Sequence, residues 1–229
     1  MSLVDYSVEG AVGRIMLDRP PVNALNGELI GDIDAALAAA EEPAIRAVVI
    51  TGKKHFAAGA DIKRFVDAFD SDDPEPQASG LGAVVKRLEQ LEKPTIAAIS
   101  GYALGGGLEL ALGADFRYMA SDAKVGQPEI LLGIIPGAGG TQRLRRIVGF
   151  QAAKEMIMSG RQVAAAEALE LRLADKVLEP DDLLAIALED AAGWATGPTR
   201  AYWAVKKAMG DGFGHSLDGA LEIEREVFE

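Results

Sequence analysis

Three consecutive glycines between a predicted strand and a predicted helix constrain the fold of this chain more than any other feature. The apolar run at residues 95–99 is typical of a buried strand, and residues 108–112 begin a helical pattern. Gly105, Gly106 and Gly107 leave this junction without side chains, so another group can approach the backbone closely. Free N–H groups at a helix start favour an anion, or an oxygen that becomes one.

The same arrangement, a turn of small residues before a helix, occurs around residues 56–63 and again around residues 131–142. If the N–H groups of Ala60 and Gly106 converge on one oxygen, they form an oxyanion hole, worth about 3–4 kcal/mol per donor. Glu109 and Glu129 are the carboxylates beside these turns. The alternative is that each is an ordinary capping or surface glutamate.

Apolar segments that alternate with helical patterns predict an α/β (α+β) fold without a dividing linker. Residues 3–8 and 11–17 predict a hairpin, and Asn26 is expected to cap the helix that follows. Residues 127–129 indicate a turn. The last third of the chain is helical in pattern, and residues 175–178 are its only strand candidate.

Composition and motif searches exclude several classes of protein. A net charge of −12 argues against nucleic-acid binding. The lack of a secretion signal and of a long uncharged apolar stretch predicts a cytoplasmic chain that does not span a membrane. There is no cysteine, and the two histidines are far apart, so we expect no metal site. Dinucleotide, phosphate-loop and nucleophile-elbow motifs do not occur.

Four segments, in the same order and over nearly the whole chain, resemble the enoyl-CoA hydratase (crotonase) family; they are residues 19–26, 56–63, 96–111 and 126–144. The resemblance implies a crotonase-like spiral of ββα units at residues 1–195 and a C-terminal helical trimerisation region at residues 196–229, effectively one domain. It also implies that this helical region is shorter than in relatives.

The resemblance implies an enoyl-CoA hydratase that adds water syn to a 2-trans-enoyl-CoA and yields a 3-hydroxyacyl-CoA. The amides of Ala60 and Gly106 match the family's oxyanion hole. Glu109 matches the base that activates water, and Glu129 matches the acid that protonates the α-carbon. The implied substrate-binding residues are Ala58, Asp61, Ile62, Lys63, Gln127 and Gly137.

Gln127 and Gly137 are expected to position Glu129 and the water. The cations nearest the CoA phosphates would be Lys53, Lys54 and Lys63. CoA belongs to the substrate, so no separate cofactor is expected. The implied partners are the acyl-CoA thioester and further copies of the chain, in a trimer or a dimer of trimers.

Two alternatives stay open at this point. An enoyl-CoA isomerase or another acyl-CoA lyase of the same family would keep the oxyanion hole, although an isomerase does not need Glu109. The short helical region favours the second alternative, a catalytically silent acyl-CoA-binding protein. Acyl-chain length is open too, because residues 67–79 lie where relatives vary.

Overall fold

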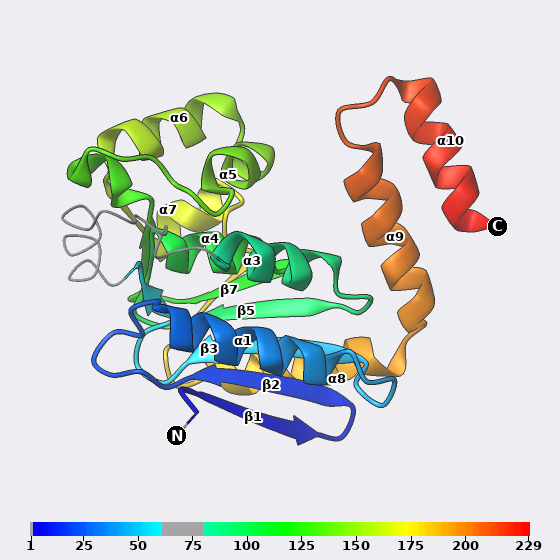
Figure 1. Cartoon of the computed structure of the whole chain (residues 1–229), viewed down its shortest axis with the longest axis horizontal. Coiled ribbons are helices and arrows are strands. Elements are labelled where there is room, and N and C mark those ends of the chain that lie inside the picture. The colour runs from blue at the N-terminus through cyan, green and yellow to red at the C-terminus, as the bar shows by residue number, and fades with distance from the viewer. Residues whose placement is uncertain (1, 61–79) are drawn as a thin grey trace, which may run out of the picture.

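A computed structural model describes residues 2–60 and 80–229 and shows a layered α/β body with a helical arm (Figure 1). Its main sheet has the strand order β1-β2-β3-β5-β7-β10. The strands β1 and β2 form the predicted antiparallel hairpin, and the others run parallel. The bounds are Val4–Glu9, Val12–Leu17, Ala47–Gly52, Thr95–Ile99, Phe116–Ala120 and Lys176–Leu178.

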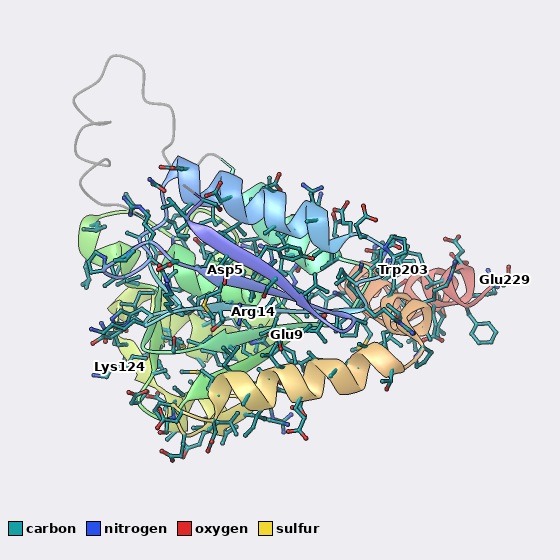
Figure 2. All side chains as sticks on the ribbon, turned by 90° about the horizontal axis from the view of Figure 1, so that it is seen from below. Asp5, Glu9, Arg14, Lys124, Trp203 and Glu229 are labelled. Carbon is teal, nitrogen blue, oxygen red and sulfur yellow. The ribbon has the colours of Figure 1, made fainter. Side chains whose placement is uncertain are left out.

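The central strands of this sheet are covered on both faces. Every residue of β3 and β5 is buried, which explains their continuous runs of apolar and small side chains. Figure 2 shows the helix α1 (Gly27–Ala40) on one side of the sheet and α8 (Leu183–Thr196) on the other. Asn26 caps α1 as predicted, because its Oδ1 accepts a hydrogen bond from the Leu29 N–H at 2.9 Å.

A second, smaller sheet has the order β4-β6-β8-β9. The chain passes from β3 to β4, from β5 to β6 and from β7 to β8, so it alternates between the two sheets as it advances. This alternation confirms the expected spiral of repeating units. The bounds are Ala57–Ala58, Tyr102–Leu104, Lys124–Gly126 and Gln162–Ala164.

Two local predictions were wrong. The strand β9 lies in the segment predicted to be helical, where it pairs antiparallel with β8. Three residues carry too little pattern to reveal a strand without its partner. The predicted turn at residues 127–129 instead begins a 3₁₀ helix, η1 (Pro128–Leu132), which has proline at its first position.

The remaining helices of the body pack against the smaller sheet or against one another. Of these, α3 packs beside α1 and α4, while α5 packs beside α4 and α6. Their bounds are Leu81–Gln90 for α3, Gly106–Leu112 for α4, Gly140–Val148 for α5, Phe150–Ser159 for α6 and Ala165–Glu170 for α7. In the described ranges 2–60 and 80–229, no helix combines the length and apolarity needed to cross a bilayer.

The C-terminal helices α9 (Thr199–Gly212) and α10 (Leu217–Phe228) form a hairpin that projects from the body (Figure 1). Polar contacts attach its base. Arg46 Nη2 donates to Gly197 O at 2.6 Å, and Lys206 Nζ lies 2.9 Å from Asp115 Oδ2. The boundary predicted between residues 195 and 196 falls one residue before the end of α8, and it stays a prediction.

Candidate active site

The two amides predicted to converge lie at matching positions beyond neighbouring parallel strands. In the register of β4 and β6, Ala58 pairs with Leu104. Two residues beyond the end of each strand are Ala60 and Gly106. The two backbones stay in contact beyond the strand ends, because a Cβ atom on Gly105 would lie 3.7 Å from the Cα of the residue that precedes Ala60.

The glycine triplet is explained by backbone conformation and by close approach. Gly105 is the N-cap of α4 and has φ +52° with ψ −126°, a conformation that side chains disfavour. A Cβ atom on Gly107 would lie 2.0 Å from Ala57 O, so only glycine fits there. Gly106 is the first residue of α4, where the N–H has no partner inside the helix.

Glu109 is buried in the first turn of α4, and backbone N–H groups bind its carboxylate. The residue is only 3 % exposed. Oε1 accepts hydrogen bonds from the N–H of Ala138 at 2.7 Å and of Gly140 at 2.8 Å. Burial raises the pKa of Glu109, while the two N–H donors and the charge of Arg143 oppose that rise.

Glu129 lies in the first turn of η1, against the start of α4. Its Oε1 is 3.0 Å from the position that a Cβ atom on Gly105 would occupy. Burial, reinforced by the negative charge of Glu109, raises the pKa of Glu129 to about 7, although its own backbone N–H opposes this rise. At neutral pH, Glu129 therefore holds a proton in a large fraction of molecules.

Gln127 is fully buried beside Glu129. With its amide nitrogen turned toward the carboxylate, Gln127 donates to Glu129 Oε1 at 2.9 Å and to Oε2 at 3.1 Å. This contact fixes the direction in which the carboxyl group points. The role of Gln127 in the reaction stays a prediction.

The other predicted residues are spread around this centre. Ala58 is half-buried in β4, and its N–H donates to Val22 O at 3.0 Å. Gly137 is exposed, and its predicted positioning role stays a prediction. Lys53 is paired with Asp18 at 2.6 Å, and Lys54 is exposed. The predicted residues outside the described ranges are Asp61, Ile62, Lys63 and residues 67–79.

Sequence reasoning missed the two amides that bind Glu109. The third glycine-rich segment was noted only as a turn before a helix, although free N–H groups collect at such a junction. That signal was sufficient to expect a bound anion near Ala138 and Gly140. It did not show that the anion is the carboxylate of Glu109, which lies 29 and 31 residues away along the chain.

Together these groups bring two carboxyl side chains close to backbone N–H groups at the start of α4. Two backbone donors can stabilise a negative oxygen. Beside them, burial raises the pKa of Glu109 against two N–H hydrogen bonds that favour its ionised form, and burial raises the pKa of Glu129 to about 7. Two carboxyl groups with different pKa values can serve as a base and an acid in the same reaction.

The raised pKa of Glu129 predicts that Glu129→Gln makes the folded protein more stable above pH 7. Between pH 4.5 and 7 the folded chain keeps a proton that the unfolded chain releases, so the free energy of unfolding falls as the pH rises through this range. A shift from 4.5 to about 7 corresponds to as much as about 3 kcal/mol. We expect the variant's advantage over the wild type to grow with pH up to pH 8 and to stay below that upper value, because solvent screens the half-buried carboxylate.

Urea unfolding of both proteins at several pH values between 4 and 8 measures this difference. Glu189→Gln, at an exposed position on α8, is the matched control and should follow the wild type at every pH. A constant difference between Glu129→Gln and the wild type from pH 4 to 8 would contradict the assignment.

The chain is similar to known proteins over nearly its whole length. A sequence profile of the enoyl-CoA hydratase/isomerase family matches residues 7–229. A short-chain-enoyl-CoA hydratase of Clostridium acetobutylicum is 40% identical over 226 residues, which cover 96% of this chain and 85% of that protein. A crotonyl-CoA hydratase of Syntrophomonas wolfei is 40% identical over 228 residues, covering 96% and 86%. The crystal structure of an enoyl-CoA hydratase from Bacillus anthracis superposes with a TM-score of 0.91 at 36% identity, covering 99% of this chain and 89% of that one.

Proposed function

The chain belongs to the enoyl-CoA hydratase/isomerase family, and we propose that it is an enoyl-CoA hydratase whose site residues are Ala60, Gly106, Glu109 and Glu129. The reaction adds water to a 2-trans-enoyl-CoA and gives a 3-hydroxyacyl-CoA. One observation carries the assignment within the family. Glu109 and Glu129 lie beside the same glycine turn, and the N–H groups of Ala138 and Gly140 bind the carboxylate of Glu109 alone.

The proposed reaction begins at the thioester carbonyl, which accepts hydrogen bonds from the N–H groups of Ala60 and Gly106. These donors draw electrons toward the oxygen and make the β-carbon electrophilic. Glu109 takes a proton from a water molecule while the water oxygen bonds to the β-carbon. The C=C electron pair moves to the α-carbon, passing through an enolate that the two amides stabilise.

Glu129 completes the proposed reaction by giving its proton to the α-carbon. Because both carboxyl groups lie on one side of the bound chain in this arrangement, the new C–O and C–H bonds form on the same face, which gives syn addition. The proton that Glu109 has taken and the one that Glu129 has lost are then re-equilibrated with water. In the dehydration direction the two groups exchange roles.

A crotonyl-CoA assay tests this proposal. Purified protein should bleach the absorbance of the conjugated enoyl thioester and yield 3-hydroxybutyryl-CoA. Migration of the double bond in a 3-enoyl-CoA without water uptake would instead identify an isomerase. Binding of a CoA thioester in a calorimeter with no turnover of short or long enoyl-CoA would identify a silent acyl-CoA-binding protein.

The proposed assembly is a homotrimer or a dimer of trimers. The chain exposes two different apolar surfaces, and two unlike surfaces that fit one another build a closed ring rather than a symmetric dimer. The arm surface consists of Val205, Met209, Phe213, Leu217, Leu221 and Phe228. The surface on η1, the loop after it and α6 consists of Ile130, Leu131, Leu132, Ile135, Phe150 and Met158. A cytoplasmic location stays a prediction.

We expect Met209→Glu to shift the protein from trimer to monomer, because a charge in an apolar contact loses its hydration. Sedimentation velocity at matched protein concentrations measures the change. Ala185→Glu adds the same charge at an exposed position on α8 and should leave the assembly intact. A wild-type protein that sediments as a monomer at micromolar concentration would overturn the proposed assembly.

A further inference from the structure

An arginine on α5 holds the loop that binds Glu109 from the opposite side. Arg143 Nη1 donates to Ala138 O at 3.0 Å. The N–H of that same residue, Ala138, donates to Glu109 Oε1. The short loop of residues 138–140 therefore lies between the guanidinium and the carboxylate, with one carbonyl bonded to the former and two N–H groups bonded to the latter.

The guanidinium is itself fixed by a glutamate on α3. Arg143 Nε lies 3.1 Å from Glu89 Oε1, and Nη2 lies 2.7 Å from Oε2. Such paired contacts define the orientation of the planar group as well as its position. The Arg143 side chain is 17 % exposed, so solvent screens the pair only in part.

The loop is shaped to let the guanidinium come this close. Gly139 has φ +104°, in the region that favours glycine. A Cβ atom on Gly139 would lie only 2.0 Å from Arg143 Nη1. The guanidinium therefore packs directly against bare backbone, and a side chain at this position would displace it.

We propose that Arg143, held by Glu89, is a positioning residue that sets the place and the ionisation of the Glu109 carboxylate. The inference rests on the proposed function, in which Glu109 acts as the base. Arg143 touches neither substrate nor water in this account. It acts through the Ala138 carbonyl and through its charge.

The electrostatic surroundings give Arg143 a second effect, which is to make the two carboxyl groups unequal. Its charge lowers the pKa of Glu109 against the larger effect of burial. Among the described residues, no cation lowers the pKa of Glu129. One cation on one side of the pair therefore favours an ionised Glu109 and a protonated Glu129, the state from which hydration begins.

Other charged and titratable groups on the elements packed against α4 have different partners or are exposed. On α3, Lys86 is exposed, and Arg87 pairs with Asp34 and Glu41. On β6, the ring of Tyr102 stacks on His55. On α5, Arg145 is exposed, and Arg146 donates a hydrogen bond to Gln142 O. On η1, the titratable group is Glu129 itself.

The test compares Arg143→Gln with Arg143→Lys in crotonyl-CoA hydration. Arg143→Gln removes the charge and the paired guanidinium hydrogen bonds, and we expect kcat to fall about 10- to 100-fold with little change in KM. The acid limb of its kcat/KM profile should move to higher pH. Arg143→Lys keeps the charge but not the paired hydrogen bonds. Its kcat should therefore fall, while the acid limb of its kcat/KM profile stays near that of the wild type. Arg145→Gln, on the same helix and exposed, should match the wild type.

A readout that needs no turnover separates this inference from the proposed function. Carbon-13 NMR of labelled glutamate carboxyls, with Glu109 assigned through Glu109→Gln, follows the titration directly. Arg143→Gln should move the Glu109 titration to higher pH. Glu89→Gln is the second variant, for use if Arg143→Gln does not fold. It leaves Arg143 without its counter-charge, so the Glu109 titration should move to lower pH. A wild type without turnover would overturn the proposed function alone, whereas unmoved titrations in both variants would overturn the positioning role.

Discussion

Glu129→Gln lowers kcat for hydration of crotonyl-CoA by about 10²- to 10⁴-fold, the loss that accompanies removal of a general acid. The substituted amide keeps the size of the side chain and can still contact Gln127. It cannot deliver a proton to the α-carbon. Because burial raises the pKa of Glu129 to about 7, this group holds a proton in a large fraction of wild-type molecules at neutral pH. Stopped or continuous assays of enoyl absorbance give the ratio.

The stability of the Glu129→Gln variant is the control for this prediction. Burial of a charge at position 129 opposes folding, so the glutamine variant should be at least as stable as the wild type above pH 7. Loss of turnover therefore cannot be attributed to unfolding. Binding of a non-reactive acyl-CoA in a calorimeter should stay within a few-fold of the wild type. A variant that keeps more than a tenth of wild-type kcat would remove Glu129 from the mechanism.

Gly106→Pro lowers kcat by about 10²- to 10³-fold, because it deletes one donor of the oxyanion hole. Gly106 is the first residue of α4, where proline fits the helix and the missing N–H breaks no intrahelical bond. The helix that carries Glu109 should therefore form. The substitution removes the interaction with the enolate oxygen, which strengthens as the reaction proceeds, so kcat should fall more than KM rises.

Gly106→Ala is the matched control for the side-chain volume that proline adds at this position. A Cβ atom at this position would lie 2.9 Å from Leu81 Cδ2 and 3.2 Å from Leu25 Cδ1, and both are ends of flexible side chains. Alanine therefore reports the cost of that contact with the N–H still present. Equal losses in the alanine and proline variants would show that crowding, rather than the missing donor, causes the effect.

Local sequence was sufficient to predict the buried strand, the glycine turn and the helix start around Gly106, but not the short strands β4 and β6 that lead to Ala60 and Gly106. An apolar strand, glycines and a helix start occur within residues 95–112, and each signal is local. The alternation between two sheets was predicted only through the family resemblance. The strand β9 was missed because its three residues pair with β8, 36 to 40 positions earlier, and that pairing leaves no mark in its own sequence.

The carboxylates were identified from the sequence, but their different surroundings were not. Glu109 receives N–H groups from residues on α5 and its preceding loop, and Glu129 lies in a 3₁₀ helix that was predicted to be a turn. The pKa of each depends on burial and on neighbours brought together by the spiral. A single sequence holds no local signal for such contacts. Arg143 was overlooked for the same reason, since its partner Glu89 is on another helix.

Product analysis in water labelled with oxygen-18 tests the central claim most directly. The wild-type protein, given crotonyl-CoA in labelled water, should release 3-hydroxybutyryl-CoA that carries one labelled oxygen at the β-carbon. Glu109→Gln and Glu129→Gln should each form that product at least about 10²-fold more slowly. Unlabelled crotonyl-CoA recovered intact from the wild-type protein, or equal rates in all three proteins, would contradict the account.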